Sequence, residues 1–237
     1  GHVLVRRVLA FFAIIFVLTR GGPVGATTSL SILTWEQSFG FFRMGHGAAV
    51  GVVHENKLVW SKGIGFADVK KKRPADTKTL YRIASITKTF TATAVMQLRD
   101  EGKLALDDPL VTYLPELASA RSTFAPIEGL TIRRLLSHES GLQSEPPDAD
   151  FSLVLYESEA AKNLARAADI SLTVPPNTQW KYSNLGYQLL GELVARVSGM
   201  TYARYIRSRM LTPLKMTSTA LDPVPQRLRA RRAIGYE

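Results

Sequence analysis

The sequence contains no cysteine among its 237 residues. That absence excludes disulfide bonds, thiolate catalysis and metal sites with cysteine ligands. The four histidines, His2, His46, His54 and His138, show none of the spacings typical of zinc ligands. We therefore expect no metal site. Low-complexity tracts are also missing, and a composition of 46% hydrophobic and 21% charged residues is typical of a globular protein.

Acidic residues are scarce relative to basic ones, 20 against 30, which leaves a net charge of +10. The basic residues cluster at Lys70–Arg73 and again near the C-terminus, at Arg227, Arg229, Arg231 and Arg232. Such an excess can attract nucleic acids or other anionic surfaces. No aromatic residues interleave with either cluster, although a surface that stacks bases requires them. We expect solvated side chains and no nucleic-acid partner, while association with cell-wall polymers or anionic membranes stays open.

Long hydrophobic runs are limited to the N-terminus. Arg6 and Arg7 precede the apolar run Val8–Leu18, eleven residues long, and Val24-Gly25-Ala26 follows. This pattern is typical of a cleaved signal peptide, and a membrane span needs about 20 apolar residues. We predict a signal peptide over residues 1–26 and an extracytoplasmic protein, periplasmic or secreted. A buried core helix and an uncleaved membrane anchor are the alternatives.

Two kinds of pattern divide the rest of the chain, which we take as one domain over residues 27–237. Residues 47–67 alternate around the polar turn Glu55–Lys57 and predict a β-hairpin, with a charged loop at 70–76. Residues 81–220 are mostly helical in pattern. Helices are predicted from Ser85 to Gly102, from Pro109 to Leu114, from Thr131 to Gly141, and over 158–168, 185–197 and 201–210. A hairpin alone is marginal, and Arg231–Glu237 offers at best the start of another strand, so we expect the sequence to be truncated at its C-terminus.

Ser85 and Lys88 are the first candidates for chemistry. A serine hydroxyl is a poor nucleophile without a neighbouring base. Residues three apart share one face of a helix, so Ser-x-x-Lys at a helix start places a hydroxyl beside an amine. This pattern alone is weak evidence for a nucleophile, because a helix cap followed by a surface lysine gives the same sequence pattern. Tyr182-Ser183-Asn184 follows about a hundred residues later and offers a second set of polar side chains.

The surrounding strings carry a resemblance to a known family. Segment 81–88 (YRIASITK) resembles the active-site segment of the serine β-lactamase-like and penicillin-binding superfamily. Segments 101–109, 135–142 (LLSHESGL) and 182–187 (YSNLGY) match the same superfamily in order and spacing. They are most similar to the class C β-lactamase branch, which includes DD-peptidases and esterases. The resemblance runs from about Gly47 to the last residue.

This resemblance implies a fold and a set of roles. The fold would be α+β, with an antiparallel sheet flanked by helices, a mostly helical region, and the C-terminal strands of the sheet missing. Ser85 would be the acylated nucleophile and Lys88 would help to remove its proton. Tyr182 would pass that proton to the leaving group and later activate the deacylating water. Asn184 would bind the substrate's amide side chain, with the N-cap of a helix as its alternative role.

Other residues of the matching strings are expected to be structural. The equivalent of His138 belongs to a structural turn in the family, and Asp107 and Asp108 are interpreted as helix caps. Asn177 stands where a glycine often follows the proline, a mild departure because asparagine tolerates the left-handed conformation. No glutamate-based deacylation loop of class A enzymes is evident.

The family's third motif, Lys-Thr-Gly or His-x-Gly, is not found after Asn184. Its strand supplies the second oxyanion donor, and loss of one such donor costs about 10²–10³ in rate. The predicted function is acyl transfer through an acyl-serine, without metal or organic cofactor. A β-lactam, a D-Ala-D-Ala peptide and a small ester all suit this nucleophile. A penicillin- or wall-peptide-binding module without turnover, or an inactive fragment of such an enzyme, is the alternative.

Overall fold

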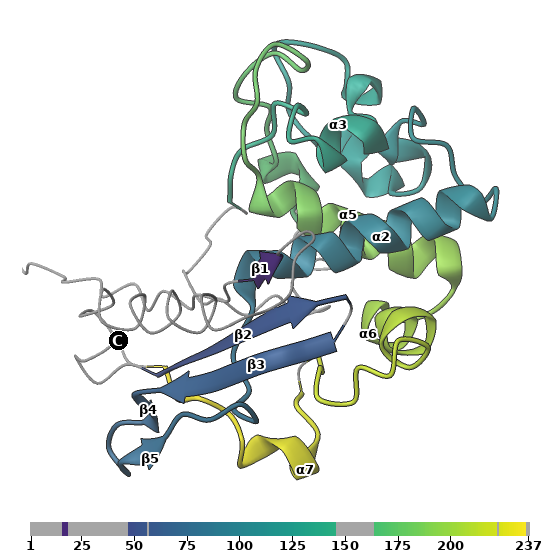
Figure 1. Ribbon diagram of the computed structural model, residues 1–237. Coiled ribbons are helices and arrows are strands. Elements are labelled where there is room, and N and C mark those ends of the chain that lie inside the picture. The colour runs from purple at the N-terminus through teal and green to yellow at the C-terminus, as the bar shows by residue number, and fades with distance from the viewer. Residues whose placement is uncertain (1–15, 19–46, 56, 146–163, 222, 236–237) are drawn as a thin grey trace, which may run out of the picture. The chain divides into compact units, whose positions relative to one another are not determined.

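The computed structural model describes residues 16–18, 47–55, 57–145, 164–221 and 223–235 (Figure 1). The chain forms two compact units. One is Ala84–Asp222, which is mostly helical, and the other joins Gly1–Ile83 to Pro223–Glu237 and holds the strands. A small sheet in one unit and packed helices in the other make an α+β protein. The predicted fold class is therefore confirmed.

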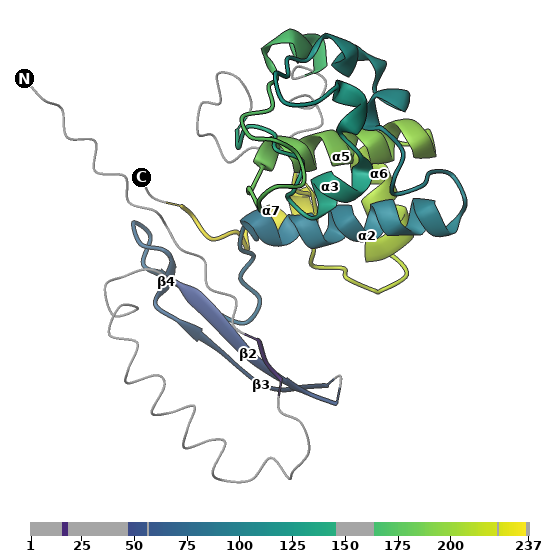
Figure 2. The ribbon, with the colours of Figure 1, turned by 90° about the horizontal axis from the view of Figure 1, so that it is seen from above.

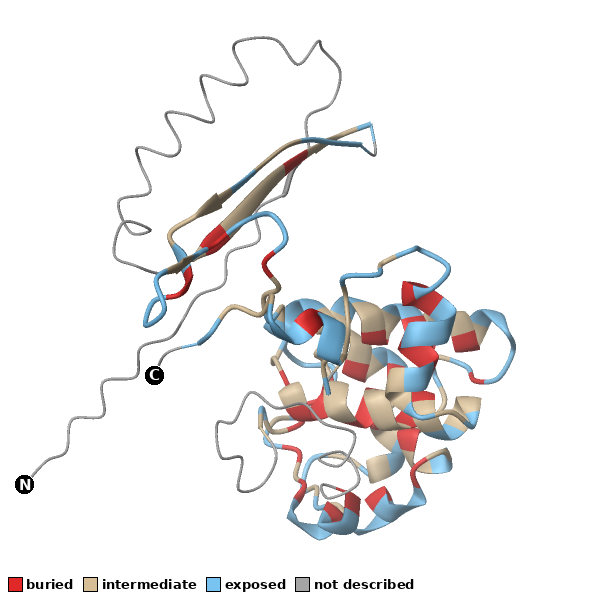
Figure 3. Cartoon of the chain, turned by 90° about the horizontal axis from the view of Figure 1, so that it is seen from below, coloured by how far each residue is buried: buried red, intermediate tan, exposed pale blue. Residues whose placement is uncertain are grey.

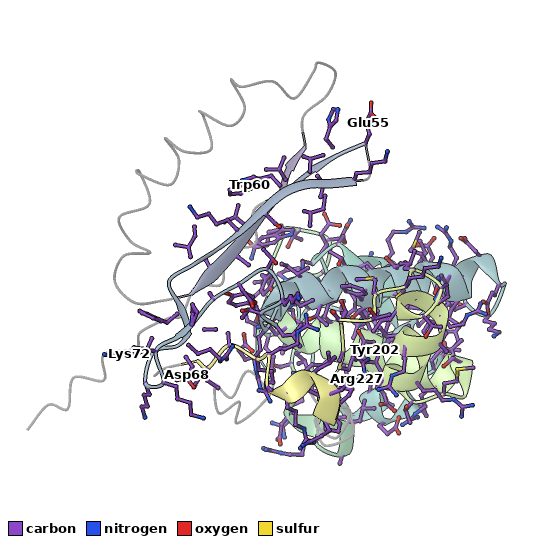
Figure 4. All side chains as sticks on the ribbon, turned by 60° about the horizontal axis from the view of Figure 1, so that its bottom comes forward. Glu55, Trp60, Asp68, Lys72, Tyr202 and Arg227 are labelled. Carbon is purple, nitrogen blue, oxygen red and sulfur yellow. The ribbon has the colours of Figure 1, made fainter. Side chains whose placement is uncertain are left out.

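The strand-bearing unit is built on the predicted hairpin. Strand β2 (Ala48–His54) pairs antiparallel with β3 (Lys57–Ile64), from Ala48 opposite Ile64 to His54 opposite Lys57. In Figure 4, Glu55 marks the tip of this hairpin and Trp60 lies along β3. A short strand β1 (Phe16–Leu18) runs parallel to β2. Apart from β1, the predicted signal peptide lies outside the described residues.

The sequence interpretation was wrong just after the hairpin, where it placed one strand up to Phe66 and then a loop. Gly65 adopts a φ of +68°, which ends β3 and lets the chain turn. Strand β4 (Phe66–Asp68) then pairs antiparallel with β5 (Arg73–Pro74). Residues 69–72, which include the lysines of the basic run, form the connection, and Lys72 lies at its tip in Figure 4.

The last described residues are held against this unit by backbone hydrogen bonds. The N–H of Leu80 donates to Arg231 O at 2.9 Å, and Ala233 N–H donates to Leu80 O at 2.8 Å. Ile234 N–H donates to Ala67 O at 2.8 Å. Residues 231–234 thus begin to pair as a strand would, after a short helix α7 (Gln226–Arg229) that was not predicted.

The helical unit is organised around two long helices that run side by side in Figures 1 and 2. Helices α2 (Thr87–Asp100) and α5 (Asn184–Ser198) form this pair, and α3 (Ile132–Leu136) and α6 (Tyr202–Ile206) pack against α5. A π-helical turn, η7 (Arg207–Leu211), continues α6. Short 3₁₀ turns complete the described part of the unit: η2 (Ala84–Ile86), η3 (Leu110–Thr112), η4 (Pro115–Ser119), η5 (Ile127–Gly129) and η6 (Ala167–Asp169).

Apolar side chains at helical spacing fill the space between these helices. Leu98 of α2 and the α5 residues Leu189, Leu190 and Leu193 are 0% exposed. Figure 3 shows the buried positions in red along facing sides of the helices. Burial of one leucine side chain contributes about 1.5–3 kcal/mol. This continuous core gives the helix starts that carry the site a rigid base.

Local signals in the sequence predict most helix ends correctly. Gly102 ends α2 with φ +70°, and Lys103 N–H donates to Leu98 O while Gly102 N–H donates to Arg99 O, a Schellman motif. Gly199 ends α5 with φ +66°. Thr131 caps α3 by accepting a hydrogen bond from Arg134 N–H.

Two predicted helices have other bounds in the structure, and a third is not tested. Pro109 is the N-cap of η3 and not its first helical residue, because its ψ of 132° is extended. Helix α3 ends at Leu136, five residues before Gly141. The helix predicted over 158–168 lies largely outside the described residues. In the part of the chain that the structure does describe, no helix combines the length and the apolar character of a membrane span.

Candidate active site

Ser85 and Lys88 lie where the chain enters α2. Ser85 is the middle residue of η2, and Lys88 is the second residue of α2. The preceding residue, Ala84, has a φ of +43°, an uncommon value for a residue with a Cβ. This strained turn presents the exposed Ser85 side chain at the helix start. The Lys88 Nζ donates to Ser85 Oγ at 3.5 Å, so the expected one-turn juxtaposition is present.

Tyr182 approaches the same oxygen from another part of the chain. Its hydroxyl donates to Ser85 Oγ at 2.7 Å, a short and well-formed contact. The Lys88 Nζ lies 4.7 Å from the centre of the Tyr182 ring. The serine oxygen therefore accepts from a phenol and an ammonium at once, and both donors favour negative charge on that oxygen.

Asn184 meets Lys88 directly. Lys88 Nζ donates to Asn184 Oδ1 at 2.6 Å, and Asn184 Nδ2 donates to Glu145 Oε1 at 2.6 Å. The ammonium is thus held between the serine and the amide. The structure brings together all four predicted site residues, and their chemical roles stay predictions.

Ser183 is the N-cap of α5, so the alternative of Asn184 as the cap is wrong. The Ser183 Oγ accepts from Gly186 N–H at 2.9 Å and donates to the backbone oxygen of Gln143 at 2.8 Å. Ser183 is 1% exposed. A serine suits this position because its hydroxyl can accept from the first turn of the helix. The two hydrogen bonds fix the residue between Tyr182 and Asn184.

His138 packs against the ring of Tyr182 and hydrogen-bonds to the backbone of Ser183. Its φ of +62° marks a tight turn, in agreement with the structural role expected from the resemblance. The Nδ1 accepts from Ser183 N–H at 3.2 Å, and the ring centre lies 4.6 Å from that of Tyr182. Burial lowers the pKa of His138, and the Lys88 charge lowers it further. A neutral imidazole that accepts through Nδ1 suits this position.

Tyr187 completes the packing under the site. Its hydroxyl donates to Leu136 O at 3.0 Å, and its ring lies 5.1 Å from His138 and 5.5 Å from Lys88 Nζ. Burial, with a smaller contribution from Tyr182, raises the pKa of the Tyr187 hydroxyl. Aromatic faces therefore line one side of the ammonium, which is a favourable environment for a cation.

The expectation that Asp107 and Asp108 cap a helix is wrong. Asp107 pairs with Arg133, with oxygens 2.7 and 2.8 Å from the guanidinium nitrogens. Asp108 accepts from Ala105 N–H at 2.7 Å and from the Tyr113 hydroxyl. Both carboxylates therefore stabilise loops of the helical unit.

Asn177 does adopt the left-handed conformation expected of it, with a φ of +62°. Its N–H donates to Glu139 O at 2.8 Å, while Lys181 N–H donates to His138 O at 2.7 Å. These bonds tie the segment before Tyr182 to the turn around His138. The asparagine thus fills the place of a glycine without breaking the loop.

Sequence reasoning did not find Glu145, which has no spacing signal of its own. It named Ser183 without a role, although a serine directly before an apolar helix is an N-cap signal. It also passed over Trp180, a side chain that is 66% exposed and packs edge-on against His138 at 5.6 Å. Over the described ranges, no three histidine, aspartate or glutamate side chains gather as a metal site.

The chain resembles known proteins in both sequence and structure. The family described as Beta-lactamase matches residues 43–237. Protein flp of Staphylococcus aureus (strain N315) is 34% identical over 192 residues, which cover 81% of this chain and 38% of flp. The structure of the octameric penicillin-binding protein homologue from Pyrococcus abyssi is 26% identical, with a TM-score of 0.71 over 90% of this chain and 48% of that one. A class C beta lactamase from Rhodobacter sphaeroides is 27% identical, with a TM-score of 0.69 over 87% of this chain and 54% of that one.

Proposed function

Because this chain belongs to the beta-lactamase family, we propose that it is a serine hydrolase that transfers acyl groups through an intermediate on Ser85. One observation carries the proposal. Ser85 Oγ lies 2.7 Å from the Tyr182 hydroxyl and 3.5 Å from Lys88 Nζ. A nucleophile with a proton acceptor and a cation in reach, at a helix start, is an arrangement suited to acyl transfer.

In the proposed acylation step, Ser85 Oγ attacks the carbonyl carbon of the substrate. Tyr182 acts in this step as a phenolate that has released its own proton to solvent, so its oxygen, which Lys88 supports electrostatically, takes up the serine proton. The C–N or C–O bond to the leaving group then breaks, and the leaving group takes up that proton. A general base and acid within hydrogen-bond reach typically contributes 10²–10⁴ to the rate.

The carbonyl oxygen gains negative charge during the attack and needs donors. Ser85 is among the first residues of the helical segment that continues as α2. The first N–H groups of a helical segment lack intrahelical acceptors and form the positive end of its dipole. The Ser85 N–H is therefore our candidate for one oxyanion donor. Hydrolysis of the acyl-serine then requires a water that gives its proton to Tyr182.

The substrate class is proposed more broadly: a β-lactam, a D-Ala-D-Ala peptide or a small ester. The likeness to a penicillin-binding protein homologue and a class C beta lactamase supports the first two. The chain spans 38% of the length of protein flp. The activity and the substrates of the whole protein to which this chain belongs are therefore proposals. The apolar N-terminal run supports an extracytoplasmic location, where cell-wall peptides are found.

Covalent labelling tests the nucleophile. Fluorescent penicillin and a fluorophosphonate are expected to label the purified protein, with the adduct located on Ser85 by peptide mass spectrometry. Ser85→Ala should abolish the label, whereas Ser119→Ala, at an exposed serine of η4, should keep it. Labelling of Ser85→Ala at the wild-type rate would refute the assignment.

The same experiment separates turnover from binding. An adduct that decays with release of product supports a hydrolase, while one that persists supports a penicillin-binding module. The rates of nitrocefin and p-nitrophenyl butyrate hydrolysis then rank β-lactams against esters. A wild-type protein that none of the probes labels would overturn the proposed function.

A further inference from the structure

We propose that Glu145 is a positioning residue that fixes the Asn184 amide with its oxygen toward Lys88 and its nitrogen toward Glu145. This inference rests on the proposed function, in which Lys88 acts on Ser85. The contacts that carry it are Lys88 Nζ to Asn184 Oδ1 and Asn184 Nδ2 to Glu145 Oε1, both 2.6 Å. Glu145 reaches the reacting serine through two side chains, so it acts by orienting them.

The chemistry of the three groups permits one orientation of the amide. A lysine ammonium is a donor without acceptor capacity, and an ionised carboxylate is an acceptor without donors. A primary amide has one end of each kind. With Lys88 on one side and Glu145 on the other, the rotated amide would face donor with donor and acceptor with acceptor. Both contacts would be lost together, which makes the observed orientation the stable one.

Backbone bonds hold the two ends of this contact in register. The N–H groups of Asn184 and Leu185 both donate to Ser144 O, at 2.7 and 3.2 Å. Lys181 Nζ donates to Leu142 O at 3.1 Å on the same loop. Glu145 follows Ser144 directly, so its carboxylate is placed beside the first residue of α5. The loop is thus anchored to the helix start independently of the Glu145 side chain.

Removal of the carboxylate frees the amide to rotate. The Asn184 NH₂ can then face the Lys88 ammonium, and Lys88 loses its shortest contact. The contact of the ammonium with Ser85 Oγ is long, at 3.5 Å, and would not hold it in place alone. The ammonium would therefore turn away from Ser85 Oγ. A displacement of about 1 Å in a catalytic group can cost up to 10²-fold in rate.

A double-mutant cycle on thermal unfolding tests the 145–184 contact, on which the orientation depends, without any need for activity. Asn184→Asp makes position 184 an acceptor on both sides, so it opposes Glu145. Glu145→Gln offers an NH₂ to that acceptor and removes the like charge. We expect Asn184→Asp to be better tolerated in the Glu145→Gln background, by about 3 °C or more in Tm, the size of a charge-assisted hydrogen bond in a chain of this length.

Other effects of the new charge cancel in this cycle. An aspartate in the first turn of α5 also gains from the helix dipole and from Lys88, equally in both backgrounds. The coupling between the two substitutions therefore reports the 145–184 contact. Additive effects, with a coupling below about 1 °C, would overturn the proposed orientation.

Labelling by fluorescent penicillin, or by the fluorophosphonate, tests the consequence for Ser85. Glu145→Ala should lower the labelling rate about tenfold, while Glu145→Gln, which keeps an acceptor, should stay within about threefold. Glu139→Ala is the matched control, because its carboxylate accepts from Ser137 on the same loop. Unchanged labelling of Glu145→Ala would overturn the positioning role. If wild type is unlabelled, the proposed function fails, and the Tm cycle still tests the 145–184 contact that the orientation requires.

Discussion

Replacement of Ser183 by alanine removes one hydroxyl that makes two hydrogen bonds, one buried and one partly buried. Loss of the N-cap contact to Gly186 N–H costs about 0.5–2 kcal/mol. The Gln143 carbonyl also loses its donor, and an unsatisfied buried acceptor costs about 1–3 kcal/mol. Since Ser183 is 1% exposed, water does not readily replace either bond. We expect a total loss of about 2–4 kcal/mol in the free energy of unfolding.

This loss corresponds to a fall in Tm of roughly 6–12 °C for a chain of this length. Thermal unfolding followed by far-ultraviolet circular dichroism measures it, since the long helices α2 and α5 dominate that signal. Thr201→Ala is the matched control, because Thr201 caps α6 through Arg204 N–H from an exposed position. It should cost about 1 kcal/mol or less. Equal losses for both variants would refute the argument that the second, partly buried bond to Gln143 adds to the cap.

Two further predictions concern stability. Gly141→Ala places a Cβ 2.2 Å from Val174 O at a φ of +77°. The control Gly102→Ala has a similar φ of +70°, but nothing lies within 4 Å of its Cβ. Gly141→Ala should therefore lower Tm far more than Gly102→Ala, and equal losses in a thermal melt would contradict the close approach. His138→Asn keeps an acceptor and tolerates positive φ, but it does not titrate. Because burial lowers the pKa of His138 below its ordinary 6.5, the folded wild type should lose stability as pH falls from 6.5 through the lowered pKa. Urea unfolding of His138→Asn should show a smaller loss over that range, and identical pH slopes would contradict it.

Features that depend on neighbours in sequence were predictable. The Schellman motif at Gly102, the left-handed Gly199 and the Thr131 cap are each closed by bonds within a few residues. Ser85 and Lys88 belong to the same class, because helical spacing alone brings them together. The strand pair β4–β5 was missed because three- and two-residue strands carry almost no periodic signal.

The contacts of Glu145 could not be predicted, because they join positions 39 residues apart. The loop and the start of α5 meet residue by residue: Ser183 Oγ bonds Gln143 O, and Asn184 N–H bonds Ser144 O. Asn184 Nδ2 then bonds Glu145. Sequence patterns report which face of an element is apolar, but not which polar loop lies across its first turn.

This pairing has a physical consequence for the site. Tyr182 and Asn184 flank a buried cap, so the backbone of neither residue can move far without breaking the bonds between Ser183 and the loop. Ser85 and Lys88 are held separately, by the core that α2 shares with α5. The distances from Tyr182 and Asn184 to Ser85 and Lys88 are therefore set by helix packing on one side and by the 143–145 loop on the other. Substitutions in that loop should disturb the side chains of Asn184 and Tyr182, while the backbone positions of Ser85 and Lys88 stay fixed by the core.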